Sequence, residues 1–593
     1  MFLEGRKVKI MKKGYTDERN AQIVISLMKK NGIKKVVASP GATNICFVAS
    51  LQYDPYFEIY SAADERSAAY MACGLAAESG EVVALSCTGA TSSRNYMPAL
   101  TEAYYRQLPI LVITSSRRSE RIGHNIDQVT DRTLLPRDVA KLSVQMPLVH
   151  DYESEWADIV AANKAILELD HHGKGPVHIN LETNYSSVYS TQPLPEIRSI
   201  SRVCYGDDFP SLGEYSRIAI MVGAHVKWSA RLTKAVDDFC KNHNAIVLCD
   251  HCSNYKGRYR VLANLIAQQR YFNSVIKSAD FVIHIGNISA SNYGVNMKKV
   301  WRVCEDGEIR DTYKKLRVVF EMTEEKFFEH YSNVEIKEEN TFYGECQNEN
   351  SDIRNNIPEI PFSNAWIASV TADKLPQNSV IHFGILNSLR TWNYFEIPQS
   401  CVESSNTGGF GIDGSLSTII GAALTDKENL HYCVLGDLAF FYDMNALGNH
   451  NIGNNVRILL VNNGRGTEFR LSGSQGRQFE EDCDPYIAAA GHYGNKSKNL
   501  VKHYAEDLGF EYYSAETKEE FLDILPDFID PNLREKSAIF EVFTDSENEN
   551  TAMVELCNIK KNQGEVIKGE IVGLAKEVLK PKGIKKIKRI LGK

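Results

Sequence analysis

Short apolar segments alternate with helical patterns along almost the whole chain. The first block contains KKVVASPG, VVALSCTG, PILVITSS and PVHINLET. The same rhythm returns in RIAIMVGAH, AIVLCDH, DFVIHIGN and LRVVFEM, and then in SVIHFG, HYCVLGD, RILLVNNG and AIFEVFT. Continuous apolar runs are typical of strands buried on both faces, and helices between them act as crossovers that keep the strands parallel. We therefore predict an α/β chain with three doubly wound parallel-sheet domains.

The linkers between these blocks give the expected domain boundaries. A segment with two prolines, STQPLPEIRSISRV, closes the first block, and a polar stretch around ECQNENSDIRNN precedes the third. We expect a first domain at 14–195, a central domain at 200–345, a third domain at 358–550 and a basic tail at 551–593. The first and third blocks have the same size and layout, which indicates two related domains. The first should open with a helix that follows Thr16 as its cap and runs through Lys29.

The composition excludes several classes of protein. The 593 residues are 43% hydrophobic and 24% charged, with a net charge of −8. There is no run of eighteen apolar residues, and the N-terminus lacks the apolar core of a secretory signal. Thirteen scattered cysteines fit reduced thiols, so we expect a cytoplasmic protein, and we expect no nucleic-acid partner. The CxxC pair, Cys249 and Cys252, has no second pair at zinc spacing and is interpreted as two ordinary thiols.

The C-terminal tail differs in charge from the rest of the chain. Residues 558–593 contain eleven Lys or Arg and three Glu. The last stretch, GLAKEVLKPKGIKKIKRILGK, has the pattern of a basic amphipathic helix with a break at Pro581. Such helices contact acidic lipid surfaces. Weak membrane-surface contact and a merely solvated tail are both open interpretations.

Polar side chains follow two consecutive strands of the third block. Asp437 ends one strand and Asn463 ends the next, with a helix predicted between them at about 442–447. Because neighbouring parallel strands end at the same edge of a sheet, these side chains should converge. A carboxylate and an amide oxygen suit Mg²⁺, which fills its octahedron with phosphate and water. Gly464 and Gly466 would let backbone amides approach that phosphate. The alternative is two turns that use these residues by chance.

This spacing, with Asn463 26 positions after Asp437, resembles the diphosphate–Mg²⁺ motif of thiamine-diphosphate (ThDP) enzymes. Leu438 replaces the last glycine of the usual GDG, a variation of one branch, the menaquinone-pathway succinyl-enolpyruvyl-hydroxycyclohexene-carboxylate synthases. Other similar stretches are SPG at 39–41, DER at 64–66, YMPALTEA at 96–103, NTGGFGIDGSLST at 406–418 and GDLAFFYDMNAL at 436–447. The resemblance covers residues 16–550 and is weakest in the central block.

The resemblance implies ThDP and Mg²⁺ as cofactors. It implies that Asp437 and Asn463 bind the metal through their side chains and Arg465 through its carbonyl. The further implied cofactor-binding residues are Pro40, Gly41, Gly409, Phe410, Ile412, Gly436, Leu438, Gly466 and Thr467. Ile412 is implied to be the apolar wedge under the bent cofactor, with a plain core isoleucine as the alternative.

Two residues of the first domain are implied to be catalytic. In YSAADERSAAYMACGLAAESG, Glu65 stands at the start of a helix of small residues that we expect to be buried. The resemblance implies that Glu65 hydrogen-bonds N1′ of the cofactor's aminopyrimidine, and low polarity would help it to give and take a proton there. The alternative is a solvated carboxylate paired with Arg66. Gln128 is implied to face the thiazolium and the bound donor.

The chain departs from the synthase pattern at arginines that bind substrate. The family's SPGSRS is SPGATN here, and its SNRGASGIDG is SNTGGFGIDG, with Thr407 in place of Arg. Arg117 keeps a matching arginine. Because arginines bind carboxylates in forked pairs, we expect neither a dicarboxylate donor nor menaquinone synthesis. The candidate substrate contacts are Asn44, Arg117, His124, Arg390 and Thr407.

The leading hypothesis is ThDP- and Mg²⁺-dependent decarboxylation of a 2-oxo acid, with pyruvate as the first choice, and carboligation of the fragment to a polar or sugar-like acceptor. A simple 2-oxo-acid decarboxylase or acetolactate-type synthase and a non-catalytic ThDP-fold binding protein are the alternatives. The resemblance implies a homodimer at minimum, or a tetramer, with active sites between subunits. The central block has no full dinucleotide fingerprint, so we do not expect FAD.

Overall fold

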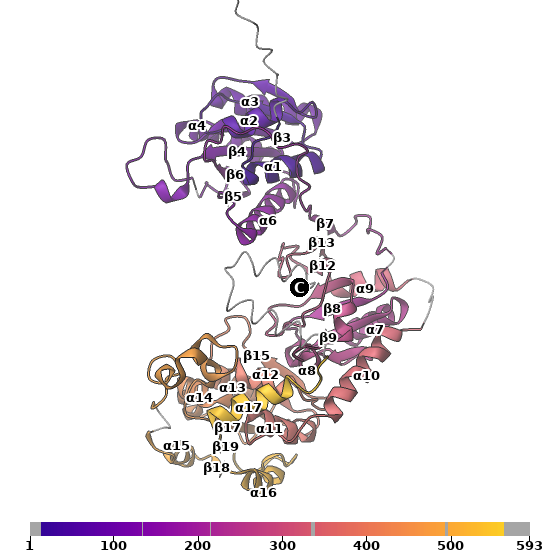
Figure 1. Ribbon diagram of the computed structural model, residues 1–593, viewed down its shortest axis with the longest axis vertical. Coiled ribbons are helices and arrows are strands. Elements are labelled where there is room, and N and C mark those ends of the chain that lie inside the picture. Colours follow the sequence, from indigo (N-terminus) through magenta and orange to yellow (C-terminus); the bar gives the residue numbers. More distant parts are fainter. Residues whose placement is uncertain (1–13, 133, 214, 334–338, 493–495, 563–593) are drawn as a thin grey trace, which may run out of the picture. The chain divides into compact units, whose positions relative to one another are not determined.

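The computed structural model describes residues 14–132, 134–213, 215–333, 339–492 and 496–562 (Figure 1). The chain forms two compact units. One comprises Met1–Asp207 with Gly307–Glu321, and the other comprises Asp208–Asp306 with Met322–Lys593. The strand pairings described are parallel, and helices separate most consecutive strands. This confirms the predicted fold class.

The first unit contains a six-stranded sheet in the order β2-β1-β3-β4-β6-β5. Its strands are β1 (Lys35–Ala38), β2 (Glu58–Ser61), β3 (Val83–Thr88), β4 (Ile110–Ser116), β5 (Leu142–Met146) and β6 (Val177–Glu182). Its helices are α1 (Arg19–Lys30), α2 (Ile45–Gln52), α3 (Glu65–Ser79), α4 (Thr91–Asn95), α5 (Met97–Tyr105) and α6 (Tyr152–Glu168).

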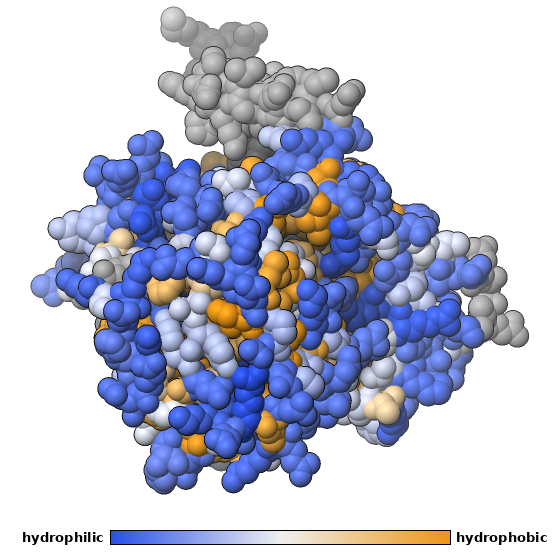
Figure 2. Space-filling view, turned by 90° about the horizontal axis from the view of Figure 1, so that it is seen from below, coloured by the Kyte–Doolittle hydropathy of each residue, from blue (hydrophilic) through white to orange (hydrophobic). Residues whose placement is uncertain are grey.

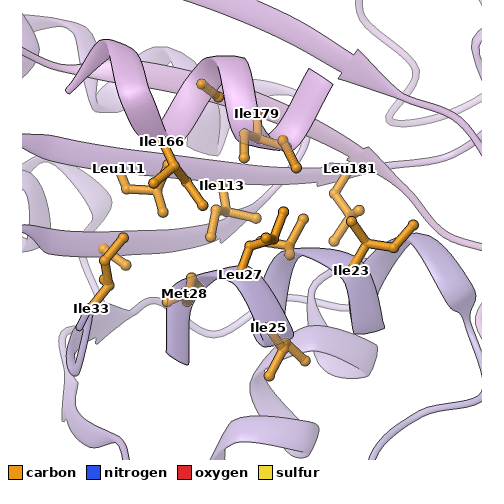
Figure 3. Packing of buried hydrophobic residues seen from close by; sticks show 14 of the residues in the cluster. Ile23, Ile25, Leu27, Met28, Ile33, Leu111, Ile113, Ile166, Ile179 and Leu181 are labelled. Carbon is orange, nitrogen blue, oxygen red and sulfur yellow. The ribbon is translucent and has the colours of Figure 1, made fainter. Parts of the chain in front are cut away.

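Alternate residues of β4 enter two different cores. Leu111 and Ile113 belong to a cluster with Ile23 and Leu27 of α1, and Figure 3 shows these side chains packed together. Val112 belongs to a second cluster, which includes small residues of α3 and α5. Because successive side chains of a strand point to opposite faces, helices cover both faces of this sheet. The sheet is therefore doubly wound, as predicted.

The central strands are shared between the two units. In the second unit β10-β9-β8-β11-β12 follow one another, and in the first unit β13 pairs with β7. These strands are β7 (Ser201–Cys204), β8 (Ile218–Val222), β9 (Ala245–Cys249), β10 (Arg260–Leu262), β11 (Phe281–Ile285), β12 (Lys299–Val303) and β13 (Leu316–Glu321). The helices of this region are α7 (Ala230–Asn242), α8 (Asn264–Ala267), α9 (Glu324–Ser332) and α10 (Thr341–Asn355).

The third sheet has the order β15-β14-β16-β17-β19-β18, which repeats the second-first-third-fourth-sixth-fifth order of the first sheet. Its strands are β14 (Val380–Phe383), β15 (Val402–Ser405), β16 (His431–Gly436), β17 (Val456–Asn462), β18 (Glu511–Ala515) and β19 (Ala538–Phe543). Its helices are α11 (Asn364–Thr371), α12 (Asn387–Trp392), α13 (Ser415–Thr425), α14 (Asp437–Asp443), α15 (Leu500–Asp507), α16 (Lys518–Phe528) and α17 (Ser546–Leu556). The predicted likeness of the first and third blocks is therefore present in the strand order.

Short 3₁₀ helices complete the described elements. They are Ser119–Arg121, His251–Ser253, Val275–Ser278, Ala372–Lys374, Met444–Gly448, Thr467–Arg470 and Gln475–Cys483.

Several predicted boundaries were wrong. The first helix begins at Arg19, not at residue 17, because the buried Thr16 hydroxyl accepts from the amide of Glu18 and stabilises a turn before the helix. The helix predicted at 442–447 begins at Asp437, directly after β16. The polar stretch ECQNENSDIRNN is not a linker but most of α10, whose buried side chains include Cys346 and Ile353.

The C-terminal tail starts later than predicted. Residue 551, its expected first residue, lies within α17. Most of the basic segment, residues 563–593, lies outside the described residues. Among the helices that the structure describes, none is long and apolar enough to cross a membrane. The face in Figure 2 is mainly hydrophilic, with hydrophobic patches between hydrophilic residues.

Candidate cofactor site

Asp437 and Asn463 lie at one edge of the third sheet. Gly436, the last residue of β16, is the register partner of Val461 on β17. Asp437 is the first residue of α14, and Asn463 follows β17 directly. Because β16 and β17 are parallel neighbours, both side chains leave the sheet at the same end, as the sequence predicts.

Asp437 and the side-chain oxygen of Asn463 are both buried at this edge. The carboxyl of Asp437 is 4% exposed, and burial raises its pKa to about 7, although nearby backbone amides oppose the rise. Oδ1 of Asn463 is buried and has no hydrogen-bond partner among the described residues. A buried acceptor without a donor costs about 1–3 kcal/mol. A bound cation would remove that cost and would ionise Asp437, so the residues present fit Mg²⁺.

A second acidic residue, Glu541 on β19, acts electrostatically on Asp437. Asn462 donates to Oε1 of Glu541 at 2.7 Å, and the hydroxyl of Tyr512 donates to Oε2 at 2.7 Å. Burial raises the pKa of Glu541, and its negative charge contributes to the raised pKa of Asp437. Glu541 was not predicted from the sequence. The feature that could have indicated it is a single charged residue in the apolar strand AIFEVF.

The loop after β17 is held by its own hydrogen bonds. The carbonyl of Arg465 accepts from the amide of Thr467 at 2.8 Å, which leaves one lone pair for a metal. The amide of Gly466 donates to the carbonyl of Ala488 at 2.6 Å, so in this structure it is not free for a phosphate. The hydroxyl of Thr467 is buried without a hydrogen-bond partner among the described residues, and it fits a diphosphate oxygen.

The loop before α13 carries further residues of the second unit that were predicted to bind cofactor or substrate. Gly409 has open space around its Cα, and Phe410 has a left-handed backbone with φ 56° and a partly exposed ring. Ile412 is half-buried and packs against the core cluster that contains α13. Thr407, which takes the place of an arginine, is buried. Ile412 therefore has the contacts of a core isoleucine and still exposes part of its side chain.

Glu65 is the first residue of α3, and Asp64 caps that helix by accepting from the amide of Ser67 at 2.7 Å. The expectation that Glu65 is buried was wrong for the single chain, because its side chain is half-exposed. Its Oε2 accepts from the side-chain amide of Asn95 at 3.2 Å. The helix buries one face only and leaves large side chains, including that of Tyr70, exposed on the other.

The turn after β1 contains three predicted residues. Pro40 is exposed, and Gly41 approaches the next strand so closely that an added Cβ would lie 2.5 Å from Cβ of Thr88. The Asn44 side chain is buried, and its amide donates to the carbonyl of Ser39 at 2.9 Å. Asn44 therefore stabilises the turn and is not exposed for substrate.

Arg117 is already paired within the chain. Its guanidinium forms a forked pair with Asp127 at 3.1 and 3.2 Å, and its Nε donates to the hydroxyl of Tyr185 at 2.9 Å. Gln128 follows Asp127 with a left-handed backbone, φ 57°, and is exposed, as is His124. These exposed residues are accessible, whereas Arg117 would have to leave Asp127 to bind an anion.

Arg390 is paired in the same way in the second unit. It makes two hydrogen bonds to Glu468, at 2.7 and 2.9 Å. Burial alone would lower the pKa of Arg390, but the hydrogen bonds to Glu468 raise it above its ordinary value. Both arginines predicted to contact substrate are therefore neutralised by acidic residues of this chain.

A cavity of about 620 Å³ lies beside the end of β17. Its lining includes Asn463, Gly464, Lys498, Thr517 and Lys518. Lys498 pairs with Glu516 at 2.8 Å. These lysines were not predicted from the sequence, because they come from segments more than 30 residues after Asn463.

Comparisons with known proteins show what the whole chain is similar to. Residues 19–135 match the family model "Thiamine pyrophosphate enzyme, N-terminal TPP binding domain". The 2-succinyl-5-enolpyruvyl-6-hydroxy-3-cyclohexene-1-carboxylate synthase of Phocaeicola vulgatus is 32% identical, over 93% of this chain and 100% of that protein. The protein of that name from Bacteroides thetaiotaomicron is 31% identical, over 89% of this chain and 96% of its own length.

A solved structure, the thiamine diphosphate-dependent 4-hydroxybenzoylformate decarboxylase of Rhodococcus jostii, is 16% identical with a TM-score of 0.38, over 89% of this chain and 99% of that one. That score is too low to support an argument. The similarity to the synthases extends over almost their whole length. The chain therefore belongs to the thiamine-diphosphate enzymes, in the family of the 2-succinyl-5-enolpyruvyl-6-hydroxy-3-cyclohexene-1-carboxylate synthases.

Proposed function

We propose that this enzyme uses ThDP and Mg²⁺ to decarboxylate a 2-oxo acid and to join the remaining fragment to a polar acceptor. The observation that carries the proposal is the buried pair at the sheet edge. Asp437 has a raised pKa and Asn463 an acceptor oxygen without a donor, and one divalent cation would satisfy both.

The residues of the second unit would hold the cofactor's charged end. Asp437, Asn463 and the carbonyl of Arg465 would bind Mg²⁺, while Thr467 and the backbone near Leu438 would contact the diphosphate. ThDP, when bound, supplies a nucleophilic carbon and an acceptor for the electron pair that CO₂ leaves behind. The chain's own part is to place that carbon and to exclude water from it.

Glu65 would hold and exchange a proton at N1′ of the aminopyrimidine. Its half-exposed position at the start of α3 supports an arrangement in which a second subunit covers it. We therefore propose a homodimer at minimum, with each active site completed by two chains. Gln128, exposed and close along the chain to Arg117, would face the donor.

The donor is proposed to be a small 2-oxo acid, with pyruvate as the first choice. The relatives' name describes a product with a succinyl group, and decarboxylation of 2-oxoglutarate would supply such a group. Against this donor, Arg117 is bound by Asp127 and Arg390 by Glu468. Neither guanidinium can bind the second carboxylate of 2-oxoglutarate without losing its present acidic partner.

Product analysis with two donors tests the proposal. The enzyme would be incubated with ThDP, Mg²⁺ and either pyruvate or 2-oxoglutarate, with and without hydroxylated acceptors, and CO₂ and coupled products would be measured. Faster CO₂ release from pyruvate, with a coupled product only when an acceptor is present, would support the proposal. Acetaldehyde or acetolactate from pyruvate alone would instead indicate the simple decarboxylase or acetolactate-type reaction.

Faster CO₂ release from 2-oxoglutarate than from pyruvate would instead indicate 2-oxoglutarate as the donor, which would supply the succinyl group in the relatives' name. Glu65→Gln serves as the control, because it removes the proton exchange but keeps the shape of the side chain. Donor turnover that survives in Glu65→Gln would contradict the role of Glu65. If the protein does not bind ThDP, the remaining hypothesis is a non-catalytic binding protein with the ThDP-enzyme fold.

We also propose a reducing, cytoplasmic location. All thirteen cysteines are free, and most are buried. Free buried thiols behave as small apolar residues, which fits a compartment that keeps thiols reduced.

A further inference from the structure

A cluster of titratable side chains lies away from the residues assigned to the cofactor. It consists of Glu168, His171, His172, Cys204 and Glu321, and all five belong to the first unit. Glu168 ends α6, Cys204 ends β7, and Glu321 ends β13. We name it the His–Glu cluster.

The two imidazoles of the cluster share one carboxylate. Nε2 of His171 lies 2.8 Å from Oε2 of Glu321, and Nε2 of His172 lies 2.7 Å from Oε1 of the same residue. One ligand atom from each of these three residues lies within 4.8 Å of the others. The rings of His171 and His172 are 4.0 Å apart, so their nitrogens converge from one side.

His171 lies between two carboxylates. Its Nδ1 is 3.0 Å from Oε2 of Glu168, while its Nε2 meets Glu321. If Nδ1 of the neutral ring donates to Glu168, Nε2 presents a lone pair to an acceptor. That contact is favourable only with a proton or a metal cation between the two atoms. A carboxylate on the far nitrogen is also the arrangement that orients a metal-binding histidine.

Two further residues lie beside Glu321. Sγ of Cys204 lies 3.7 Å from Oε2 of Glu321, but it is not one of the three ligand atoms that lie within 4.8 Å of one another. At Gly307, an added Cβ would lie 2.3 Å from Oε2 of Glu321, so only glycine leaves room for the carboxylate. Ligand atoms around a tetrahedral zinc ion are separated by roughly 3.4 Å, so the histidine nitrogens and Glu321 would move apart by less than ~1 Å to admit it.

The surrounding charges favour zinc over a hard cation. Nε of Arg202 lies 3.8 Å from Oε2 of Glu321, and Nζ of Lys141 lies 3.7 Å from Oε1 of Glu168. These cations offset the two carboxylates, so Mg²⁺ or Ca²⁺, which depend on anionic oxygen ligands, would gain little. Imidazole ligands suit Zn²⁺.

We propose that the His–Glu cluster is a zinc site, with His171, His172 and Glu321 as ligands, water in the fourth position, and Glu168 as the carboxylate that orients His171. The inference does not depend on the proposed reaction. The site joins the segment after α6 to the end of β13, so bound zinc would stabilise the first unit.

Zinc binding by the full-length chain tests this inference. The protein would be treated with chelator, desalted and titrated with Zn²⁺ in the presence of saturating Mg²⁺, and with Co²⁺ as a spectroscopic probe. We expect one Zn²⁺ per chain and tetrahedral Co²⁺ absorption bands that persist in Cys204→Ser, because Cys204 is not a ligand. The same titration in Asp437→Ala should be unchanged, which separates this site from the proposed Mg²⁺ site.

Variants of the cluster make the test specific. His172→Ala removes a ligand whose side chain is 72% exposed, so the chain should still fold, and zinc affinity should fall at least ~10-fold. His172→Cys should restore binding, and Glu168→Gln should weaken it by roughly 10–100-fold. His450→Ala, at an exposed histidine of the second unit, is the matched control. Absence of stoichiometric zinc, or equal affinity in His172→Ala and His450→Ala, would overturn the proposal.

Discussion

Asp437 and Asn463 leave the third sheet at the same edge, one residue beyond β16 and one residue beyond β17. Each brings a buried acceptor: a carboxyl whose pKa is raised to about 7, and an amide oxygen without a donor among the described residues. In the absence of a cation this pair lowers the stability of the fold. The same pair gives the site its affinity for a cation, because a bound metal would satisfy both acceptors at once.

The first prediction concerns Asn463. Asn463→Leu removes the buried acceptor at similar volume, so the free energy of unfolding of the metal-free protein should rise by about 1 kcal/mol. The stabilisation that wild type gains from Mg²⁺ with ThDP should be lost. Thermal unfolding with and without both ligands measures the two effects. A variant that keeps the full response to Mg²⁺ would contradict the assigned role.

The pH dependence of Asp437 gives the second prediction. Its folded-state pKa of about 7 lies above the ordinary value of 3.8. A raised pKa stabilises the fold below the ordinary value, and that contribution is lost as the pH rises through about 7. Without metal, the stability of wild type relative to Asp437→Asn should therefore fall between about pH 4 and pH 7, by at most about 1.4 kcal/mol per pH unit. The affinity for Mg²⁺ should rise over the same range and should be independent of pH in Asp437→Asn.

Glu65 gives the third prediction. Glu65→Gln should bind ThDP with Mg²⁺ and should lose donor turnover by at least ~100-fold, because the amide cannot exchange the proton. Glu78→Gln, at an exposed position of the same helix, should behave like wild type. Circular dichroism of bound ThDP and CO₂ release measure binding and turnover separately. Equal turnover in both variants would exclude Glu65 as the proton-exchanging residue.

The pairing of Arg117 gives the fourth prediction. Asp127→Asn removes the carboxylate that holds the guanidinium in a forked pair. A released Arg117 should bind a second carboxylate, so the ratio of kcat/KM for 2-oxoglutarate to that for pyruvate should rise about 10-fold, which corresponds to about 1.4 kcal/mol. Arg117→Ala in the same background should abolish the gain. An unchanged ratio would place Arg117 outside the donor pocket.

The strands that the sequence predicted are the apolar ones. β1, β3, β4 and β6 of the first sheet, and β14, β16, β17 and β19 of the third, lie inside their sheets and are buried on both faces. The missed strands β2, β5, β15 and β18 are the four edges of these sheets. Edge strands are partly exposed and carry polar residues, as in EIYS and EYYSA, so they lack the continuous apolar run.

The site could be predicted only in part for a related reason. The convergence of Asp437 and Asn463 follows from strand order and spacing, which the sequence contains. The partners of Arg117 and Arg390 depend on side-chain geometry: Asp127 is ten residues away and Glu468 is 78. The inward turn of Asn44 and the half-exposure of Glu65 also depend on packing, which no local pattern determines.

The close approach at Gly41 gives the last prediction. A Cβ added there would lie 2.5 Å from Cβ of Thr88 and 2.9 Å from its Cγ2, so the turn after β1 or strand β3 must move. Gly41→Ala should lower the free energy of unfolding by roughly 1–3 kcal/mol and should weaken ThDP binding, because the turn carries residues implied to contact the cofactor. Gly421→Ala, where an added Cβ meets nothing within 4 Å on the exposed side of α13, should instead stabilise the chain by about 1 kcal/mol. Chemical denaturation of the two variants measures this contrast, and equal stability would show that the turn after β1 adapts to the extra methyl group.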